Sequence, residues 1–500
     1  MNQQVGYAKL HAEVATLLPP PRRPGFVASS VNRRVDTEDR VLFPRGVAVE
    51  DTLAGHVEFA LRHEDLQLPL LEAALQRIPR DEMAGRFRAS PNGEYVRRMA
   101  YLWEWLRNSP LDAGARPTAS YVPLLDPAKY RVVENPRRAI TYRVLENQLG
   151  NRDFSPIVRR TRGTDRGREV LAELVAELQQ SLSDGEKDGD LYQRALSYIY
   201  LAETRSSFKI EKEEPTSSKE AAFVSLLSKA GEKKTLDEDW LVELQHLAVR
   251  NAFSHEHSFR GDQNWLDRDG SRVDYFPPAP EDLRPLMDGL MAFANEHKFT
   301  VDPIAKAAIV SFGFVYAHPF KDGNGRLHRF LLHHALAQSG LVPEGLVMPV
   351  SAVLSKNIDR YFATLTSFSE PITRLWEYRR ADDRPIAVSH PGRTPYAYWD
   401  ATGEVELTSW ALSQAVRVEV PFGVRYLAVF DQAKTTVDRE FDLPSKDISM
   451  LVKCAIDQGG KLSIHRRKQF KHLPDTVLDR VEAIVAEQLA EHPSSKVQPT

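Results

Sequence analysis

One short stretch decides how this sequence can be interpreted. It reads His318-Pro319-Phe320-Lys321-Asp322-Gly323-Asn324-Gly325-Arg326-Leu327-His328-Arg329. The stretch combines a histidine, a carboxylate, a glycine-rich turn and two guanidinium groups. Moving a nucleotide's phosphorus onto a hydroxyl requires a proton acceptor, a metal ligand and donors to phosphate oxygens, and these residue types can supply all three.

The histidine is expected at the end of a helix. Pro319 disfavours helical geometry at the residue before it, and the His318 imidazole is well suited to accept a proton near neutral pH. Upstream, Asp302-Pro303 predicts a helix start. The apolar run from Ala307 to Ala317 predicts a buried helix that is too short to span a bilayer.

The carboxylate and the turn that follow predict a phosphate site. Asp322 is a hard oxygen ligand of the kind that Mg²⁺ uses. Gly323-Asn324-Gly325 predicts a turn whose backbone N–H groups can face an anion. A helix is expected to begin near Gly325, with its positive end toward the same anion.

Two arginines and an aromatic residue complete the stretch. Arg326 and Arg329 lie three residues apart on one helix face, where both can fork onto phosphate oxygens. Phe320 is expected to be the buried anchor of the loop. A surface turn followed by a solvated helix face would explain each element alone, but their uninterrupted combination favours the functional interpretation.

At these residues the chain resembles the Fic family (filamentation induced by cyclic AMP), whose signature is HPFx(D/E)GNGRxxR. The match covers His318, Pro319, Phe320, Asp322, Gly323, Asn324, Gly325, Arg326 and Arg329. The resemblance implies a mainly α-helical fold and transfer of AMP from ATP to a Ser, Thr or Tyr hydroxyl of a protein. It also implies that His318 deprotonates the hydroxyl and that Asp322 holds Mg²⁺. Gly323–Gly325 would cradle the α- and β-phosphates, and Arg326 and Arg329 would hold the outer phosphates.

Residues 257–276 resemble the flap of this family, a small β-hairpin beside the active site. Asp269-Gly270 is a hairpin turn signal. In the family the flap docks the backbone of the target by strand addition. The resemblance therefore implies a protein substrate, with the chain itself as one target. An ordinary surface hairpin is the alternative.

Residues 206–212 resemble the family's inhibitory motif, (S/T)xxxE(G/N). Ser207 and Glu211 occupy the defining positions. The resemblance implies that Glu211 pairs with Arg329 and prevents ATP from binding productively. Lys212 departs from the pattern, because lysine adopts left-handed geometry less readily than Gly or Asn. A solvated helix end is the alternative.

A further helix is expected over Ser351–Ser367. In the family this helix helps to close the nucleotide pocket, and an Asn and a Tyr on it contact the adenosine. Asn357 and Tyr361 match these two residues loosely.

The length of 500 residues predicts two or three domains. We expect a largely helical region over 1–200, the catalytic core over 201–375 and a helical C-terminal region over 376–500, with a winged-helix-like fold as one option. Within these regions, Ala381–Pro395 predicts a linker and Val424–Phe430 a short strand. The aromatic residues of Tyr95–Leu106 predict a helix core face in preference to a base-stacking surface.

Composition limits the partners and the setting. The net charge of −3 argues against bulk affinity for nucleic acid, so DNA binding by the basic stretch Gly460–Lys471 is the less favoured alternative to target docking or dimerisation. The single cysteine, Cys454, excludes an intrachain disulfide. No secretory signal or membrane-spanning segment is evident, which predicts a cytoplasmic protein with no membrane partner.

Together these features predict an autoinhibited protein adenylyltransferase that uses ATP and Mg²⁺. Three alternatives remain. The enzyme could transfer another phosphate-containing group, or it could remove AMP with Glu211 aligning water. The chain could also be a non-catalytic regulator with a Fic fold.

Overall fold

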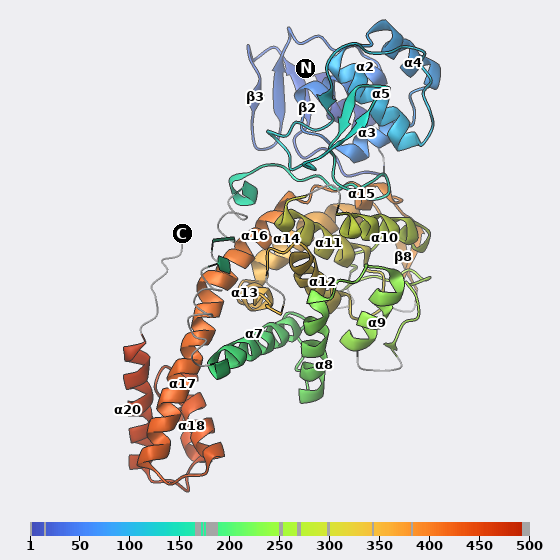
Figure 1. The fold of residues 1–500 in the computed structure, drawn as a ribbon. Helices are drawn as coiled ribbons and strands as arrows, with labels where there is room; N and C mark the ends of the chain where they lie inside the picture. The colour runs from blue at the N-terminus through green and yellow to red at the C-terminus, as the bar shows by residue number, and fades with distance from the viewer. Residues whose placement is uncertain are drawn as a thin grey trace. The chain divides into compact units, whose positions relative to one another are not determined.

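Helices form most of the chain, as predicted (Figure 1). The computed structural model describes residues 3–14, 17–165, 172–173, 175–176, 189–249, 254–267, 272–297, 301–342, 345–381 and 384–492. The chain divides into two compact units. The first unit contains Met1–Arg168, Ser228–Leu341 and Ile358–Ser409, and the second contains Glu169–Leu227, Val342–Asn357 and Trp410–Thr500.

The N-terminal part of the first unit combines helices with two small sheets that the sequence analysis did not predict. Its helices are α1 (Tyr7–Val14), α2 (Leu53–His63), α3 (Leu68–Leu75), α4 (Arg80–Ala89) and α5 (Glu94–Arg107). One sheet has the order β1-β2-β4-β3, with β1 (Gln3–Val5), β2 (Gly25–Ala28), β3 (Val35–Asp36) and β4 (Val41–Pro44). The other has the order β5-β7-β6, with β5 (Val122–Pro123), β6 (Arg137–Ala139) and β7 (Val144–Glu146).

The aromatic stretch over Tyr95–Leu106 is a core helix, as predicted. It forms most of α5, where Met99, Leu102 and Trp103 are buried. The Trp103 indole donates to the carbonyl oxygen of Ile78 at 3.0 Å. A buried ring with its N–H satisfied is typical of a core position, so this face is not available to stack bases.

The remaining helices of the first unit build the core around the stretch His318–Arg329. They are α9 (Glu238–Ala248), α10 (Pro280–Asn295), α11 (Pro303–Ala317), α12 (Asn324–Gln338), α14 (Ile358–Thr373), α15 (Thr394–Ala397) and α16 (Thr402–Gln414), with a 3₁₀ turn at Lys229–Gly231. Helices α11 and α12 pack against each other along most of their lengths. Within this contact the buried Ser311 hydroxyl donates to the carbonyl oxygen of His328 at 2.8 Å.

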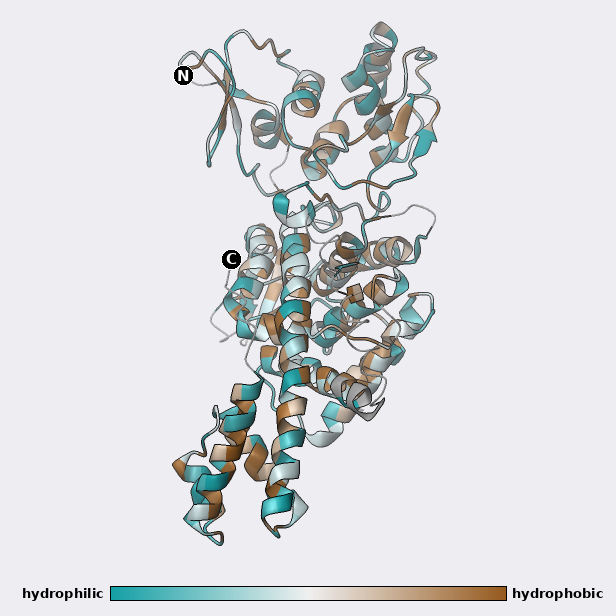
Figure 2. Cartoon of the chain, turned by 60° about the vertical axis from the view of Figure 1, so that its left-hand side comes forward, coloured by the Kyte–Doolittle hydropathy of each residue, from teal (hydrophilic) through white to brown (hydrophobic). Residues whose placement is uncertain are grey.

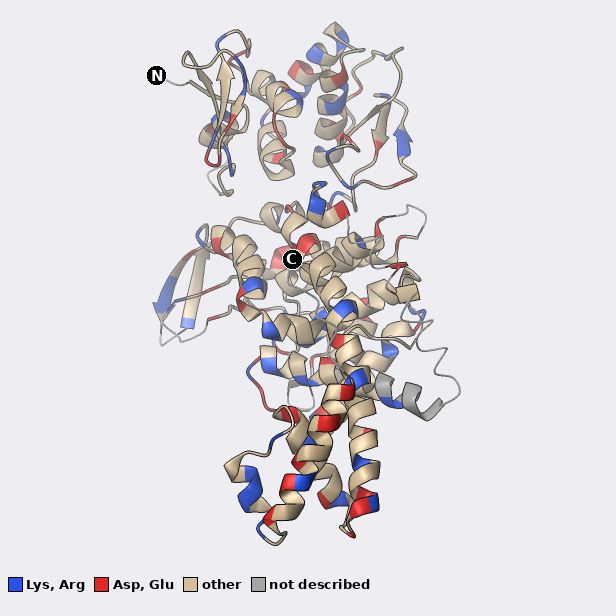
Figure 3. Ribbon diagram, turned by 90° about the vertical axis from the view of Figure 1, so that its left-hand side faces the viewer, with Lys and Arg blue, Asp and Glu red and all other residues tan. Residues whose placement is uncertain are grey.

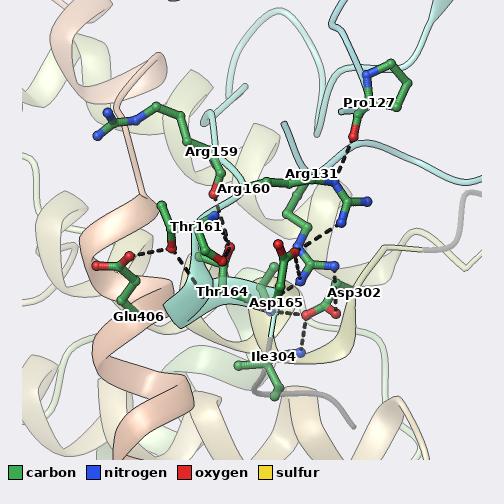
Figure 4. A network of polar contacts seen from close by, with 11 residues as sticks. Pro127, Arg131, Arg159, Arg160, Thr161, Thr164, Asp165, Asp302, Ile304 and Glu406 are labelled. Atoms are coloured by element: carbon green, nitrogen blue, oxygen red, sulfur yellow. Dashed lines mark hydrogen bonds and ion pairs between the residues drawn. The ribbon is translucent and has the colours of Figure 1, made fainter. Parts of the chain in front are cut away.

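The start of α11 is fixed by a polar network (Figure 4). Asp302 caps the helix as predicted: its Oδ1 accepts from the backbone N–H groups of Ile304 at 3.1 Å and Ala305 at 2.9 Å. Its Oδ2 lies 3.7 Å from Nη1 of Arg131, whose Nη2 lies 2.8 Å from Asp165. The network joins the N-terminal part of the unit to the helix that carries His318.

A two-stranded hairpin replaces the linker predicted over Ala381–Pro395. Strand β8 (Glu377–Ala381) pairs antiparallel with β9 (Arg384–Ser389). The hairpin continues from Trp376, whose ring stacks on Phe276 with centroids 4.8 Å apart. The linker prediction was wrong because the local Pro, Arg and Asp content gave no sign of this long-range aromatic contact.

The second unit is helical throughout its described residues. It contains α7 (Gly189–Ile210), α8 (Ser217–Ser228), α13 (Val350–Lys356), a π-helical turn at Ala415–Glu419, α17 (Val420–Glu440), α18 (Ser445–Asp457), α19 (Ile464–Gln469) and α20 (Asp475–Glu491). The single helix predicted over Ser351–Ser367 is two helices, α13 and α14, that meet at Asn357.

The C-terminal helices pack around their own hydrophobic core. Helices α17, α18 and α20 contribute buried side chains that include Val429, Leu451 and Val481. Brown and teal residues alternate along these helices at the bottom of Figure 2, as amphipathic packing requires. The strand predicted over Val424–Phe430 was wrong, because this run lies inside α17. No strand occurs among the described residues from 390 to 492, so these residues contain no wing hairpin.

Charges of both signs are interspersed on the C-terminal helices (Figure 3). In the basic stretch Gly460–Lys471, Lys461 and Arg467 both bind Glu482, at 3.0 Å and 2.6 Å. Part of the positive charge of this stretch is therefore neutralised within the fold. No helix in the described part of the chain is both long and apolar enough to cross a membrane.

Candidate active site

His318 occupies the end of α11, as its following proline predicted. Its backbone N–H donates to the carbonyl oxygen of Phe314 at 2.9 Å, and its φ of 48° and ψ of 57° lie in the left-handed region. A non-glycine residue rarely adopts this geometry, and such strain concentrates at functional sites. The turn directs the chain from α11 into the glycine-rich loop.

The imidazole of His318 is held in its neutral form. Its Nδ1 lies 3.2 Å from the carbonyl oxygen of Val315. Because a carbonyl only accepts, Nδ1 carries the proton and the Nε2 lone pair remains available as a base. Burial, together with the nearby Arg260 cation, lowers the pKa of His318 to about 4. At neutral pH the imidazole is therefore neutral, with its one proton on Nδ1.

Arg260 clamps the backbone on both sides of this histidine. Its Nε donates to the His318 carbonyl oxygen at 2.9 Å, and one Nη donates to the carbonyl oxygens of Pro278 at 2.6 Å and Ala317 at 3.4 Å. Its backbone N–H donates to the carbonyl oxygen of Pro319 at 2.8 Å. The side chain is buried, which lowers the pKa of Arg260 to about 10 and still leaves it charged at pH 7.

The sequence analysis did not single out Arg260. Its partners are backbone carbonyls from residues 278 and 317–319, which no local spacing reveals. An isolated arginine before a glycine carries no signal of such a role.

The loop after His318 is fixed from inside. Phe320 is fully buried, and its ring lies 5.7 Å from that of Phe259 and 6.3 Å from that of Phe314. The Asn324 side chain accepts from the Phe320 N–H at 3.1 Å and donates to the Phe320 carbonyl at 2.7 Å. The amide therefore acts as a brace across the loop, and the left-handed residue of the turn is Gly323.

The structure requires glycine at position 323 of the loop. Its φ is 89°, and an added Cβ would lie 2.8 Å from a methyl group of Val249. Helix α12 begins directly after it, at Asn324, with Gly325 as its second residue. The first N–H groups of a helix lack intrahelical acceptors and carry partial positive charge, so this end of α12 suits an anion.

Asp322 and Arg326 meet beside that helix end. The Asp322 carboxylate is about half exposed; its Oδ1 accepts from the Gly323 N–H at 2.6 Å and lies 3.4 Å from Arg326 Nη2. Arg326 is buried and donates from Nη1 to the carbonyl oxygen of Ala248 at 2.7 Å. Arg329, one turn further along α12, is also buried.

An accessible single carboxylate fits a Mg²⁺ ion that takes its other ligands from phosphates and water. No group of three or more His, Cys, Asp or Glu side chains within the described residues could hold a metal ion unaided. Asp322 is the ligand predicted from the sequence, and it stands next to the helix end that suits the phosphates.

The two arms of the predicted flap pair beside His318. Leu266 and Tyr275 form an antiparallel bridge, and the Leu266 N–H donates to the Tyr275 carbonyl at 2.9 Å. The Tyr275 hydroxyl donates to the carbonyl oxygen of Tyr316 at 2.6 Å. The predicted turn at Asp269-Gly270 lies outside the described residues.

The two residues expected to contact adenosine lie in different units. Tyr361 belongs to α14 of the first unit and is buried, with its ring 6.2 Å from that of His328 and 6.4 Å from that of Phe312. Asn357 ends α13 in the second unit and donates to the carbonyl oxygen of Val353 at 2.9 Å.

The predicted inhibitory motif lies at the C-terminal end of α7. Ser207 is fully buried and Glu211 follows the last helical residue. Lys212 adopts left-handed geometry, with a φ of 58°. Its N–H donates to the Lys209 carbonyl at 3.1 Å, and the next N–H donates to the Phe208 carbonyl at 3.0 Å. The helix therefore ends in the geometry that the Gly or Asn of the motif would favour, despite the lysine.

With this geometry established, comparison with known proteins identifies the domain. Residues 235–336 match the Fic/DOC family, and the chain therefore carries a Fic domain over this range. Over 128 residues the chain is 33% identical to protein adenylyltransferase fic-1 of Caenorhabditis elegans, a match that covers 25% of this chain and 23% of that protein. Over 70 residues it is 40% identical to protein adenylyltransferase Fic of Drosophila melanogaster, covering 14% of each.

The chain thus spans less than a quarter of the length of these two relatives. A crystal structure of a Fic family protein from Desulfovibrio desulfuricans G20 aligns with 53% of this chain and 79% of that chain, at 19% identity and a TM-score of 0.36.

Proposed function

We propose that this protein transfers AMP from ATP to a hydroxyl side chain of a target protein. The observation that carries the proposal is that a neutral His318 lies close in sequence to the start of α12, which follows Gly323. His318 would supply the base, and the start of α12 would bind an anion. Only the short loop braced by Asn324 separates the two. The relatives named above are called protein adenylyltransferases, which favours AMP over other transferred groups.

In the proposed reaction His318 Nε2 accepts the proton of the attacking hydroxyl. The hydroxyl oxygen forms a bond to the α-phosphorus, the bond from that phosphorus to the α,β-bridging oxygen breaks, and pyrophosphate leaves. The hydrogen bond from His318 Nδ1 to the carbonyl oxygen of Val315 fixes the tautomer that this step needs. Positioning and charge stabilisation supply most of the catalysis of phosphoryl and nucleotidyl transfer.

The phosphates would lie at the start of α12. Residues Gly323, Asn324 and Gly325 would present backbone N–H groups to them, and Arg326 and Arg329 would bind the outer phosphates. Asp322 would hold Mg²⁺, which when bound neutralises phosphate charge. Asn357 and Tyr361 remain our proposed adenosine contacts.

We further propose that Glu211 restrains the enzyme by pairing with Arg329. The support is the motif itself and the end of α7, where Ser207 is buried and Lys212 takes the left-handed turn. The flap would dock the backbone of a target protein, or of another copy of this chain, by strand addition.

Transfer of label from α-³²P-ATP to protein, with Mg²⁺ present, tests the proposal. The His318→Ala variant should bind nucleotide but transfer no label. Persistent labelling by that variant would remove His318 from the role of base. If protein were labelled by γ-³²P-ATP and not by α-³²P-ATP, the enzyme would instead be a phosphotransferase.

A further inference from the structure

A cavity in the first unit is lined by residues that are separate from the Fic motif. Its volume is about 610 Å³, within the range of pockets that enclose small organic ligands. Its lining comes from the segment of residues 19–70, from 157–159, from α14 and from residues 395–404. All four segments belong to the first unit. Close to the lining, the Thr394 hydroxyl donates to the Glu72 carboxylate at 2.7 Å.

One part of the cavity is aromatic. Phe368, Tyr398 and Trp399 line it together with several prolines. The ring of Phe368 stacks on that of Tyr316 with centroids 3.8 Å apart, and the Trp399 ring meets Tyr316 edge-on at 5.2 Å. An occupant would therefore rest on side chains that hold Tyr316, two residues before His318.

The charged groups of the lining leave an excess of positive charge. Its arginines are Arg22, Arg23, Arg34 and Arg159. Arg23 lies 3.5 Å from Asp65 and Arg159 lies 2.9 Å from Asp400, so two carboxylates of the lining already have partners. Arg34 binds Asp36 at 2.8 Å.

The other two carboxyl groups of the lining, Glu64 and Glu404, are held mainly in their neutral form by burial. Burial raises the pKa of Glu64 and of Glu404 to about 8 in each case. Glu404 accepts from the Tyr316 hydroxyl at 2.8 Å, and Glu64 accepts from the Tyr7 N–H at 2.8 Å. Both are therefore predominantly neutral acids, and the arginines outnumber the ionised carboxylates.

We propose that this cavity is a binding site for a small organic anion with a flat apolar body. The aromatic wall would stack against the body, and the arginines would attract the charged group. The proposal does not depend on AMP transfer, and its test measures binding alone.

Gly403 makes a sharp test possible. It lines the cavity, its φ lies outside the left-handed region, and a Cβ built on it would have no atom within 4 Å. A Gly403→Leu change therefore adds a branched apolar side chain at the cavity lining, and its first added carbon meets open space. Gly403→Ala is the matched control, because a methyl group leaves most of the volume open.

The probe is 1-anilinonaphthalene-8-sulfonate, a fluorescent aromatic anion, titrated into the full-length protein. We expect saturable binding that Gly403→Leu weakens at least about tenfold, a loss of about 1.4 kcal/mol, and that Gly403→Ala retains. Arg22→Glu, at an exposed residue of the lining, should also weaken binding, whereas Arg45→Glu, at an exposed residue outside it, should not.

Three results would overturn the proposal. Unchanged binding to Gly403→Leu, with its melting temperature preserved, would place the probe elsewhere. Equal affinity for the uncharged analogue N-phenyl-1-naphthylamine would remove the requirement for an anion. Absence of saturable binding to the parent protein would remove the site.

Discussion

The Nε of Arg260 donates to the backbone carbonyl oxygen of His318, the predicted base, at 2.9 Å. Among the described residues no carboxylate accepts from Arg260; its side chain donates to carbonyl oxygens of residues 262, 278, 317 and 318. A buried cation with only backbone partners is costly to retain. Arg260 is therefore best understood as a positioning residue that holds the His318 turn in its strained geometry.

Arg260→Met should lower kcat for AMP transfer about 10- to 100-fold through misplacement of His318. The KM for ATP should change little, because the Arg260 side chain donates to carbonyl oxygens of residues 262, 278, 317 and 318, which lie outside α12. Arg260→Lys should restore part of the rate, because lysine keeps the positive charge. The rate should stay below that of the parent, because an ammonium group lacks the planar fork that reaches several carbonyl oxygens.

Arg45→Met is the control for the loss of an arginine, because this side chain is exposed and lies in the N-terminal part of the first unit, outside the flap. Its steady-state rate should match that of the parent. An Arg260→Met enzyme with unchanged kcat would exclude the positioning role, and a rise in KM alone would assign Arg260 to substrate binding.

His318 should stay neutral far below the usual pKa of histidine. Its pKa of about 4 predicts that ¹⁵N NMR shows a neutral ring with Nδ1 protonated throughout the range from pH 8 to pH 5. The unfolded chain takes up this proton near pH 6.5, so the stability contributed by the neutral ring should be present above pH 6.5 and lost as the pH falls toward 4. His318→Ala identifies the resonance, and titration of that resonance near pH 6.5 would contradict the burial argument.

Gly323→Ala should destabilise the protein by about 2 kcal/mol, from left-handed strain together with the contact with Val249. Urea unfolding monitored by circular dichroism measures the change. Gly261→Ala is the matched control, because its added methyl group meets no atom within 4 Å. Equal stability of the two variants would mean that the loop relaxes freely around position 323.

Lys212→Gly should stabilise the end of α7 by about 1 kcal/mol, because glycine adopts the left-handed geometry without the penalty that lysine carries. Lys209→Gly, in the last turn of the same helix, should lower the stability of the protein, because glycine weakens a helix interior. Thermal unfolding of both variants checks the pair. A loss of stability in Lys212→Gly would show that the lysine side chain itself supports the turn.

Local signals predicted the part of the fold that surrounds His318. Asp302 and Pro303 mark the start of α11, and Pro319 marks its end, because capping and proline geometry act over one or two residues. The burial of Phe320 also followed from its place in the motif.

Long-range packing determined what the sequence could not show. The β-branched residues of Val424–Phe430 favoured a strand, yet Val429, Ala433 and Val437 share a helical face that packs into the C-terminal core. The hairpin β8–β9 depends on a stacking contact across 100 residues. Arg260 was missed for the same reason, since its role exists only once the flap and the His318 turn are brought together.

In the proposed function, His318 is the base for AMP transfer to protein, and Glu211 restrains that transfer. Intact-mass spectrometry after incubation with ATP and Mg²⁺ tests it most directly, applied to the parent protein, Glu211→Gly and the double variant Glu211→Gly/His318→Ala. We predict AMP adducts that are few on the parent, abundant on Glu211→Gly and absent from the double variant. Equal adducts on the parent and Glu211→Gly would contradict the restraint, and adducts on the double variant would contradict the catalytic assignment of His318.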